Sequence, residues 1–329
     1  MRAERGFIRY LVGRGYTSEK AEKALEYVRE VEDYFKAQGK TLEESGVDDF
    51  RLYVQKLIKD EHNTEDRLVD FSRFIQFLNL KEPWIYFASI LGGRTILPSI
   101  RDRLAQIAGI ETSDEVFSKV KAPPLGSPPS AYCDATSRLM KRIMKLDPGV
   151  YRRVLAGNHH RVPEVNFEKH REWLREEGNI DAYLKRVRRE AVADLERHLR
   201  EGKVWYEQVI TPEVVEYVRG NQELLSGVRK GKWIYNTKFP YSPREYLVER
   251  DLLMKRYYMC YCPLAREAIL SGEPEIPMDW CYCSVGFGKL RYDVIFGTDT
   301  DAEVLESVIG GSNRCKFRIR IPGEYINQL

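Results

Sequence analysis

The chain lacks three features, each typical of one class of protein: a long apolar run, an excess of one sign of charge, and a signal peptide. No apolar run approaches the ~20 residues that a membrane-spanning helix needs. Neither sign of charge dominates, because 53 Lys and Arg face 50 Asp and Glu, and the formal net charge is +3. This balance gives no bulk attraction to nucleic acid or to a membrane surface. The first residues also lack the apolar segment of a signal peptide, so we expect a cytoplasmic protein.

Cysteine is also scarce, with 6 residues in 329, yet its distribution is uneven. Four of the six form two Cys-Tyr-Cys triplets, Cys260/Cys262 and Cys281/Cys283. In a chain without a secretory signal, thiols paired this closely are typical of metal ligands or reactive thiols rather than of a disulfide framework. The remaining composition, 43% hydrophobic and 31% charged, is that of a globular protein long enough for two or three domains.

Helical periodicity dominates the N-terminal part, from Thr17 to about Leu80. Apolar residues recur there at spacings of three and four, and Thr64 is a predicted N-cap. The helix order of the segment TSEKAEKALEYVREVEDYFKAQGKTLEESGVDDFRLYVQKLIKDEHNTEDRLVDFSRFIQFLNL resembles the SAM-like core-binding domain of tyrosine recombinases. The resemblance implies a helical domain that grips DNA, but the recombinase Arg, His and Tyr constellation is not recognisable downstream. We therefore weigh DNA binding against a bundle used for interaction or for homodimerisation.

A proline-rich stretch, KAPPLGSPPS at residues 121–130, follows the helical part and predicts a linker. Beyond it, helical patterns continue until KWIYNTKFPY at residues 232–241, which predicts a strand. Residues 302–322 predict a hairpin around a glycine turn. The predicted organisation is a helical bundle at residues 1–120, a linker at 121–130, and a helical segment plus an α+β domain with an antiparallel sheet at 131–329. The fold class is therefore α+β.

The two triplets are predicted to be extended, because the residues before Cys262 alternate in character. Cys260 and Cys262 would then share one face, and so would Cys281 and Cys283. Pro263 is predicted to open a helix, which would place Cys262 beside a helix N-terminus that favours a thiolate. Two such strands would bring four sulfurs around one tetrahedral zinc ion or another transition metal.

Two histidines and four polar side chains complete the predicted site. With only two or three thiols on the metal, His159 or His160 in the Asn-His-His loop would complete the coordination or relay a proton, leaving a position open for water or substrate. An anionic small-molecule ligand would be oriented by residues near the thiols, namely Lys238, Tyr241, Arg256 and Arg266.

Simpler interpretations remain open for the same residues. The cysteines are also compatible with reactive-thiol or redox chemistry, and with inert packing in a tyrosine-rich core. Cys315 is predicted to be a sheet-core residue rather than a ligand, and His170 and His198 are predicted to lie on the surface.

The order of motifs in the last third resembles a known group of folds. CxCP, CYCS, a helix, a strand and a glycine turn before CKFRIRIP, over residues 230–322, resemble the fold of the 4-vinyl reductase domain and the L-2-amino-thiazoline-4-carboxylic acid hydrolase family. The resemblance implies an α+β domain that encloses a small molecule, often beside a cysteine-bound metal. Three hypotheses follow: a metal-dependent hydrolase of a small carboxylate or thio-compound, a small-molecule or redox sensor whose N-terminal domain contacts DNA or a protein partner, and a structural zinc domain.

Overall fold

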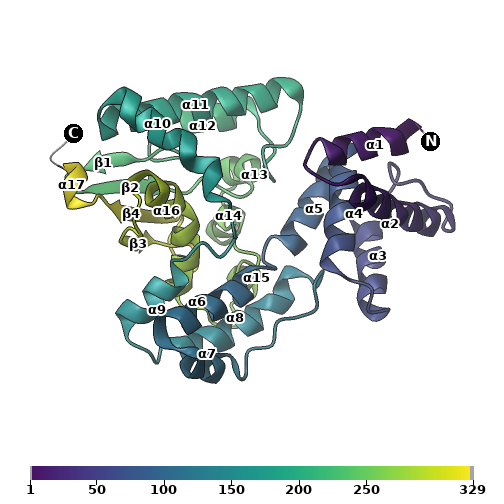
Figure 1. The fold of residues 1–329 in the computed structure, drawn as a ribbon, viewed down its shortest axis with the longest axis horizontal. Helices are drawn as coiled ribbons and strands as arrows, with labels where there is room; N and C mark the ends of the chain where they lie inside the picture. The colour runs from purple at the N-terminus through teal and green to yellow at the C-terminus, as the bar shows by residue number, and fades with distance from the viewer. Residues whose placement is uncertain (1, 327–329) are drawn as a thin grey trace. The chain divides into compact units, whose positions relative to one another are not determined.

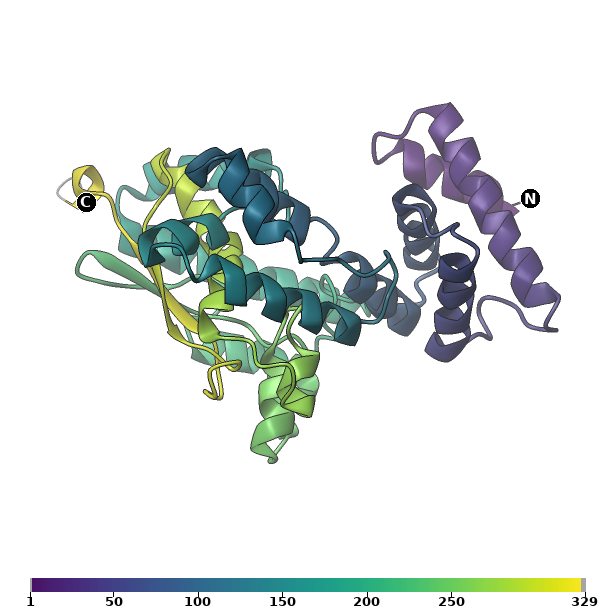
Figure 2. The same cartoon turned by 90° about the horizontal axis from the view of Figure 1, so that it is seen from below.

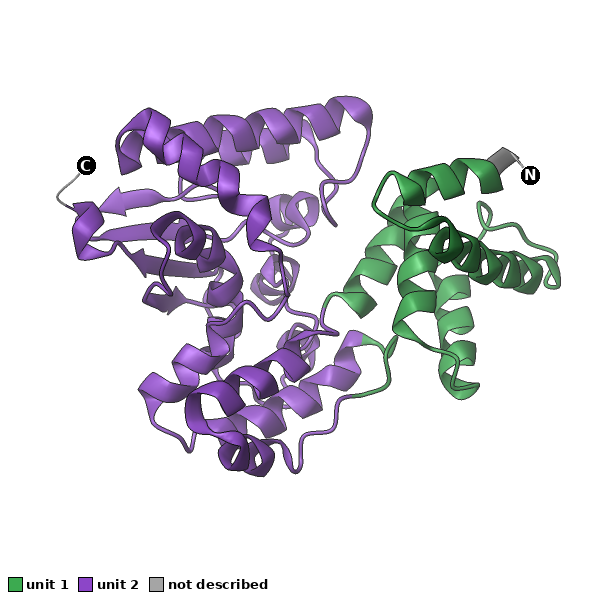
Figure 3. Ribbon diagram, in the orientation of Figure 1, with its two compact units in different colours: residues 1–92, 123–128 green, residues 93–122, 129–329 purple. Residues whose placement is uncertain are grey.

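Two compact units make up the protein (Figure 3). The computed structural model describes residues 2–326, and its side chains from Glu4 onward. The first unit contains the residues up to Gly92 together with Pro123–Pro128, and the second contains Gly93–Ala122 and the chain from Pro129 onward. Helices and one small antiparallel sheet are present, so the predicted α+β class is confirmed.

The first unit is a helical bundle. Its helices are α1 (Arg2–Val12), α2 (Ser18–Lys36), α3 (Val47–Lys59), α4 (Glu65–Phe77) and α5 (Lys81–Leu91). The apolar stripes read from the sequence meet in a core rich in phenylalanine, which includes Phe35, Phe50 and Phe71. The predicted N-cap is confirmed, because the Thr64 hydroxyl accepts a hydrogen bond from the backbone N–H of Arg67 at 3.4 Å.

The division between the units differs from the one predicted from the proline-rich stretch. Much of that stretch packs on the bundle, where the Asn63 side chain donates to the Leu125 carbonyl at 2.8 Å. Gly126 has φ +90° and approaches Val54 so closely that a Cβ atom would lie 2.7 Å from Val54 Cγ1. Residues Pro123–Pro128 are therefore a packed part of the first unit. Residues 93–120, which the sequence assigned to the bundle, instead pack in the core of the second unit.

The second unit carries most of the chain and the only sheet in the described residues. Its helical elements before the sheet are α6 (Ile96–Ala108), α7 (Ile110–Phe117), α8 (Pro129–Ile143), α9 (Pro148–Leu155), the 3-10 helix η1 (Glu164–Phe167), α10 (Glu168–Glu177), α11 (Ile180–Glu201) and α12 (Pro212–Gly220). The later helical elements are α13 (Pro243–Val248), α14 (Leu252–Met259), α15 (Glu267–Ser271), the 3-10 helix η2 (Met278–Cys281), α16 (Tyr282–Phe296) and α17 (Gly323–Ile326). Helices α13 to α15, drawn in green, stand together at one end of this unit (Figure 2).

The sheet has the strand order β1 (Val228–Lys230), β2 (Trp233–Thr237), β4 (Lys316–Arg320) and β3 (Ala302–Glu306), with all neighbours antiparallel. The predicted strand at 232–241 and the predicted hairpin at 302–322 are both present. Ile234 pairs with Ile319, and their face packs against α11 and α16 (Figure 1). The opposite face carries polar contacts, with the Arg318 guanidinium 4.1 Å from the Trp233 ring centroid. The sheet is thus buried on one side, as the alternation of apolar residues predicts.

Among residues 2–326, none of the helices combines the length and the apolar surface that a bilayer crossing requires.

Candidate functional site

Neither cysteine triplet is an extended strand, so that prediction is wrong. Helix α14 runs up to Met259, and Cys260 and Cys262 follow it in a segment without regular structure. The helix forms there because the Asp251 side chain caps it, accepting from the Met254 N–H at 2.8 Å. In the second triplet Cys281 ends η2, and α16 begins at the next residue. The alternation of side-chain types was therefore not a strand signal.

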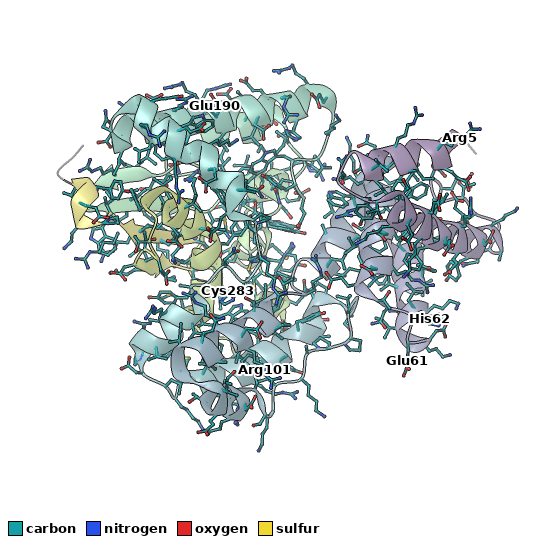
Figure 4. The ribbon with its side chains drawn as sticks, viewed as in Figure 1. Arg5, Glu61, His62, Arg101, Glu190 and Cys283 are labelled. Atoms are coloured by element: carbon teal, nitrogen blue, oxygen red, sulfur yellow. The ribbon has the colours of Figure 1, made fainter. Side chains whose placement is uncertain are left out.

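The thiols nevertheless gather in the second unit, and Cys262 is central among them. It packs against two core clusters, one containing Cys133 and Cys283 and the other containing Cys260. Figure 4 labels Cys283 within this unit. After burial, which is the larger effect, the charge of Cys262 raises the pKa values of four neighbouring thiols, those of Cys133, Cys260, Cys281 and Cys283. All six cysteines are free thiols.

The sulfur of Cys262 is surrounded by hydrogen-bond donors. The indole N–H of Trp280 donates to Cys262 Sγ at 3.1 Å. The backbone N–H groups of Leu264 and Ala265 lie close to this sulfur, although that of Ala265 donates to the Cys262 carbonyl at 3.2 Å, and the ammonium of Lys238 is also nearby. Burial raises the pKa of the Cys262 thiol, while these four groups act in the opposite direction by stabilising the thiolate. Donors of this kind suit a sulfur that carries negative charge, whether as a metal ligand or as a nucleophile.

The two remaining thiols near Cys262, those of Cys281 and Cys315, lie towards the end of the sheet. Cys281 Sγ lies 2.9 Å from the hydroxyl of Ser307, a fully buried residue that follows β3. Cys315 precedes β4 and is half-buried, and its charge raises the pKa of Cys281 after the larger effect of burial. Cys315 therefore belongs to the thiol cluster, although the sequence predicted a residue of the sheet core.

Two cations flank the thiols. Lys238 Nζ lies 2.5 Å from Ser284 Oγ and 4.6 Å from the Tyr261 ring centroid. Arg266 lies between two aromatic faces, with its guanidinium 4.4 Å from the Tyr241 ring centroid and 3.9 Å from that of Tyr257. Both were predicted ligand-binding residues, and the structure brings both of them to the cysteines.

The predicted residue Tyr241 is buried and belongs to a polar group that the sequence did not reveal. After burial, which is the larger effect, the negative charge of the nearby Glu207 carboxylate raises the pKa of the Tyr241 hydroxyl. Burial raises the pKa of Glu207, and the nearby Tyr241 hydroxyl and the charge of Arg266 act against that rise. The predicted residue Arg256 is used differently, because its Nε donates to the Val308 carbonyl at 2.9 Å. It thus supports the turn after β3.

The two predicted catalytic histidines lie in a loop that packs on α16. His159 is 1% exposed, and both ring nitrogens are engaged, Nδ1 with Ser99 Oγ at 3.0 Å and Nε2 with the Val154 carbonyl at 2.9 Å. Burial lowers the pKa of His159 to about 4, so it is neutral at neutral pH. The His160 ring packs edge-on against Phe287 of α16, with centroids 5.3 Å apart. These contacts give the loop a packing role, since they tie His159 to Ser99 and Val154 and His160 to Phe287.

His170 is buried rather than on the surface, so that prediction is wrong. Its Nδ1 lies 3.0 Å from the hydroxyl of Tyr183, and it packs between α10 and α11. The charged residues beside it in the sequence concealed this position, because one inward residue per turn suffices for a buried helix face.

Within residues 4–326, no three side chains of His, Cys, Asp or Glu are arranged to hold one metal ion. The side chains that sequence reasoning missed are Glu207, Trp280, Ser284 and Ser307, which all reach the predicted residues by tertiary contacts. For Trp280 and Ser284 the signal was proximity, since they flank the second triplet. For the other two the sequence offered no signal.

Comparison with known proteins gives one family match. The model of a family of unknown function (DUF6144) matches residues 244–326, which contain both triplets, α16 and Cys315. The match covers less than half of the chain. No curated protein and no solved structure matches this chain.

Proposed function

We propose that the second unit is a metal-binding thiol centre that holds a small anionic molecule beside the metal. The observation that carries the proposal is the gathering of the chain's cysteines around Cys262. Burial keeps the free thiols protonated, and a soft metal ion such as zinc would displace those protons and gain strong thiolate bonds. The proposed ligands are Cys260, Cys262, Cys281 and Cys283.

Two features of the surroundings support binding of a metal with its negatively charged ligands. The Trp280 indole donates to the Cys262 sulfur and two backbone amides lie close to it, as outer groups commonly do around metal-bound thiolates. The cations of Lys238 and Arg266 offset part of the charge that four thiolates would carry. Cys260 and Cys262 lie outside regular secondary structure, so rotation of their side chains can draw the sulfurs onto one ion.

The anionic ligand is proposed to bind on the side of Arg266. Its planar guanidinium is stacked on Tyr241 and Tyr257, an arrangement that fixes its direction and suits a carboxylate. Hydrolysis of a small carboxylate or thio-compound by metal-activated water is the activity to which this proposal extends.

Titration of the metal-free full-length chain with Co²⁺ tests the proposal, because thiolate ligands give cobalt an intense charge-transfer absorption. We expect this absorption to saturate at about one Co²⁺ per chain for a four-thiolate site. Cys262→Ser should weaken the absorption strongly, whereas Cys133→Ser, outside the proposed ligand set, should leave it in place. A chain that binds no Co²⁺ under reducing conditions refutes the proposal.

A second candidate is a thiol-based sensor, which the donors around Cys262 favour because they also suit a reactive thiolate. In that case the first unit would transmit the signal by contacting DNA or a protein. Gel-shift measurements across salt concentrations test the DNA version, since phosphate contacts make affinity fall as salt rises. Absence of a shift at low salt removes it.

A further inference from the structure

The guanidinium of Arg266 is fixed in place but pairs with no acid. Aromatic rings cover both of its faces, with the Tyr241 centroid at 4.4 Å and the Tyr257 centroid at 3.9 Å, and its Nε donates to the Tyr257 carbonyl at 3.1 Å. Among the side chains described from Glu4 to Ile326, none accepts a hydrogen bond from its two terminal nitrogens. The side chain is half-buried, so solutes reach it. These two nitrogens suit a carboxylate, which accepts two parallel hydrogen bonds from such a fork.

A carboxyl group is held at the other end of the Tyr241 ring. Glu207 lies in a turn closed by two hydrogen bonds between the backbone groups of Trp205 and Gln208, at 2.9 and 2.8 Å. The Trp205 ring packs edge-on against Phe239, two residues before Tyr241, with centroids 5.6 Å apart. This packing brings the half-buried Glu207 carboxyl close to the Tyr241 hydroxyl.

The opposite charges of Arg266 and Glu207 act on each other without forming an ion pair. The positive charge of Arg266 favours the ionised form of Glu207, yet no oxygen of Glu207 lies within 4.0 Å of a guanidinium nitrogen. Glu267, the acid next to Arg266 in the chain, is engaged elsewhere, because it accepts a hydrogen bond from the Tyr257 hydroxyl at 2.8 Å. The fold therefore presents one cation and one anion, at separate places around one tyrosine ring, to a molecule that carries both charges.

We propose that the anionic molecule assigned to Arg266 is an α-amino acid, bound as its zwitterion. The carboxylate of the amino acid accepts hydrogen bonds from the two terminal nitrogens of Arg266, and its ammonium donates to the carboxylate of Glu207. A hydrogen bond of about 2.8–3 Å at each end bridges the separation between the two side chains. The inference rests on the anion-binding part of the proposed function and names the class of its ligand.

A thermal-shift screen of the full-length chain against the genetically encoded L-α-amino acids, each at millimolar concentration, tests the proposal. We expect one or a few of them to raise the midpoint of thermal unfolding. For the best of these, calorimetric titration then compares the amino acid with two analogues, its des-amino acid, which lacks the ammonium, and its primary amide, which lacks the carboxylate. Each analogue should bind about 10–100-fold more weakly, because it leaves one charged partner without its hydrogen bonds.

Glu207→Gln separates recognition of the ammonium from a structural role. The substitution keeps the size of the side chain and removes its charge, so it should weaken binding of the amino acid by about 10–100-fold and leave binding of the des-amino acid unchanged. A purely structural role would weaken the binding of both. Glu273→Gln, at an exposed acid of the same unit, is the matched control and should bind both molecules as the parent does. Thermal unfolding without ligand checks that each variant is folded.

The proposal is overturned if no amino acid raises the unfolding midpoint of the folded parent chain, or if Glu207→Gln binds the amino acid as tightly as the parent. A des-amino acid that binds as tightly as the amino acid refutes the zwitterion and leaves the anion site at Arg266 in place. A chain that gives the Co²⁺ absorption and binds no amino acid loses this inference alone. Normal binding of the amino acid without any Co²⁺ absorption refutes only the metal centre.

Discussion

Helix α16 and the histidine loop pack closely because a glycine lies on each side of the contact, Gly286 in the helix and Gly157 beside the loop. Substitution of Gly286 therefore tests this packing. A Cβ atom at Gly286 would lie 2.3 Å from the Gly157 carbonyl oxygen and 2.6 Å from the Ala156 carbonyl carbon. These are backbone atoms, which no side-chain rotation can move away. Gly286→Ala therefore has to push α16 or the loop aside.

The expected change in stability follows from two opposing terms. Helix propensity favours Ala over Gly by about 1 kcal/mol in a helix interior. Overpacking costs about 1–3 kcal/mol, and contact with rigid backbone places this site at the upper end. We expect Gly286→Ala to lower the free energy of unfolding by about 2 kcal/mol.

Gly220→Ala provides the matched control. Gly220 is the last residue of α12, and an added Cβ there meets no heavy atom within 4 Å. The same substitution should stabilise the protein by about 0.4–1 kcal/mol through the unfolded state. Urea unfolding of both variants under identical conditions measures the difference. If both substitutions change stability equally, the close contact of α16 with the loop is refuted.

Three other predictions follow from buried polar contacts. Burial lowers the pKa of His170 to about 3, so between about pH 6.5 and pH 3 the unfolded chain binds one more proton than the folded chain. The free energy of unfolding should therefore decrease as the pH is lowered through this range, by up to about 1.4 kcal/mol per pH unit. Urea titrations of His170→Gln should show a smaller decrease. Lys289→Met should cost about 3–5 kcal/mol in the same assay because it leaves Asp293 without its cation, whereas Asp299, the other partner of Lys289, keeps Arg103; a smaller cost would show that the Lys289–Asp293 pair is well solvated. Trp280→Phe removes the donor to Cys262 and should weaken metal binding about 10–100-fold in chelator competition, whereas unchanged affinity would deny the indole that role.

Secondary structure could be predicted from the sequence where side chains within a few residues of one another determine it. The N-cap at Thr64, the strand after residue 232 and the final hairpin are set by side chains within a few residues, and all three are present. The prediction that the triplets are extended was wrong because alternation over a few residues does not distinguish a strand from the end of a helix. The Asp251 side chain caps α14 and so stabilises the helix that ends just before Cys260.

The candidate site could be predicted only in part, for a related reason. Lys238 and Arg266 were identified by their closeness to cysteines in the sequence, and they lie near them in the fold. Glu207 is far from the triplets along the chain and reaches Tyr241 through a turn that no motif marks. Contacts of this kind arise from the packing of whole elements, which the periodicity of a single segment does not encode.

The metal content of the full-length chain, purified without chelator and under reducing conditions, tests the central claim most directly. The proposed centre predicts about one zinc or other transition-metal ion per chain, retained in Cys133→Ser and lost in Cys262→Ser. A parent chain without stoichiometric metal, or a Cys262→Ser variant that keeps it, would contradict the claim.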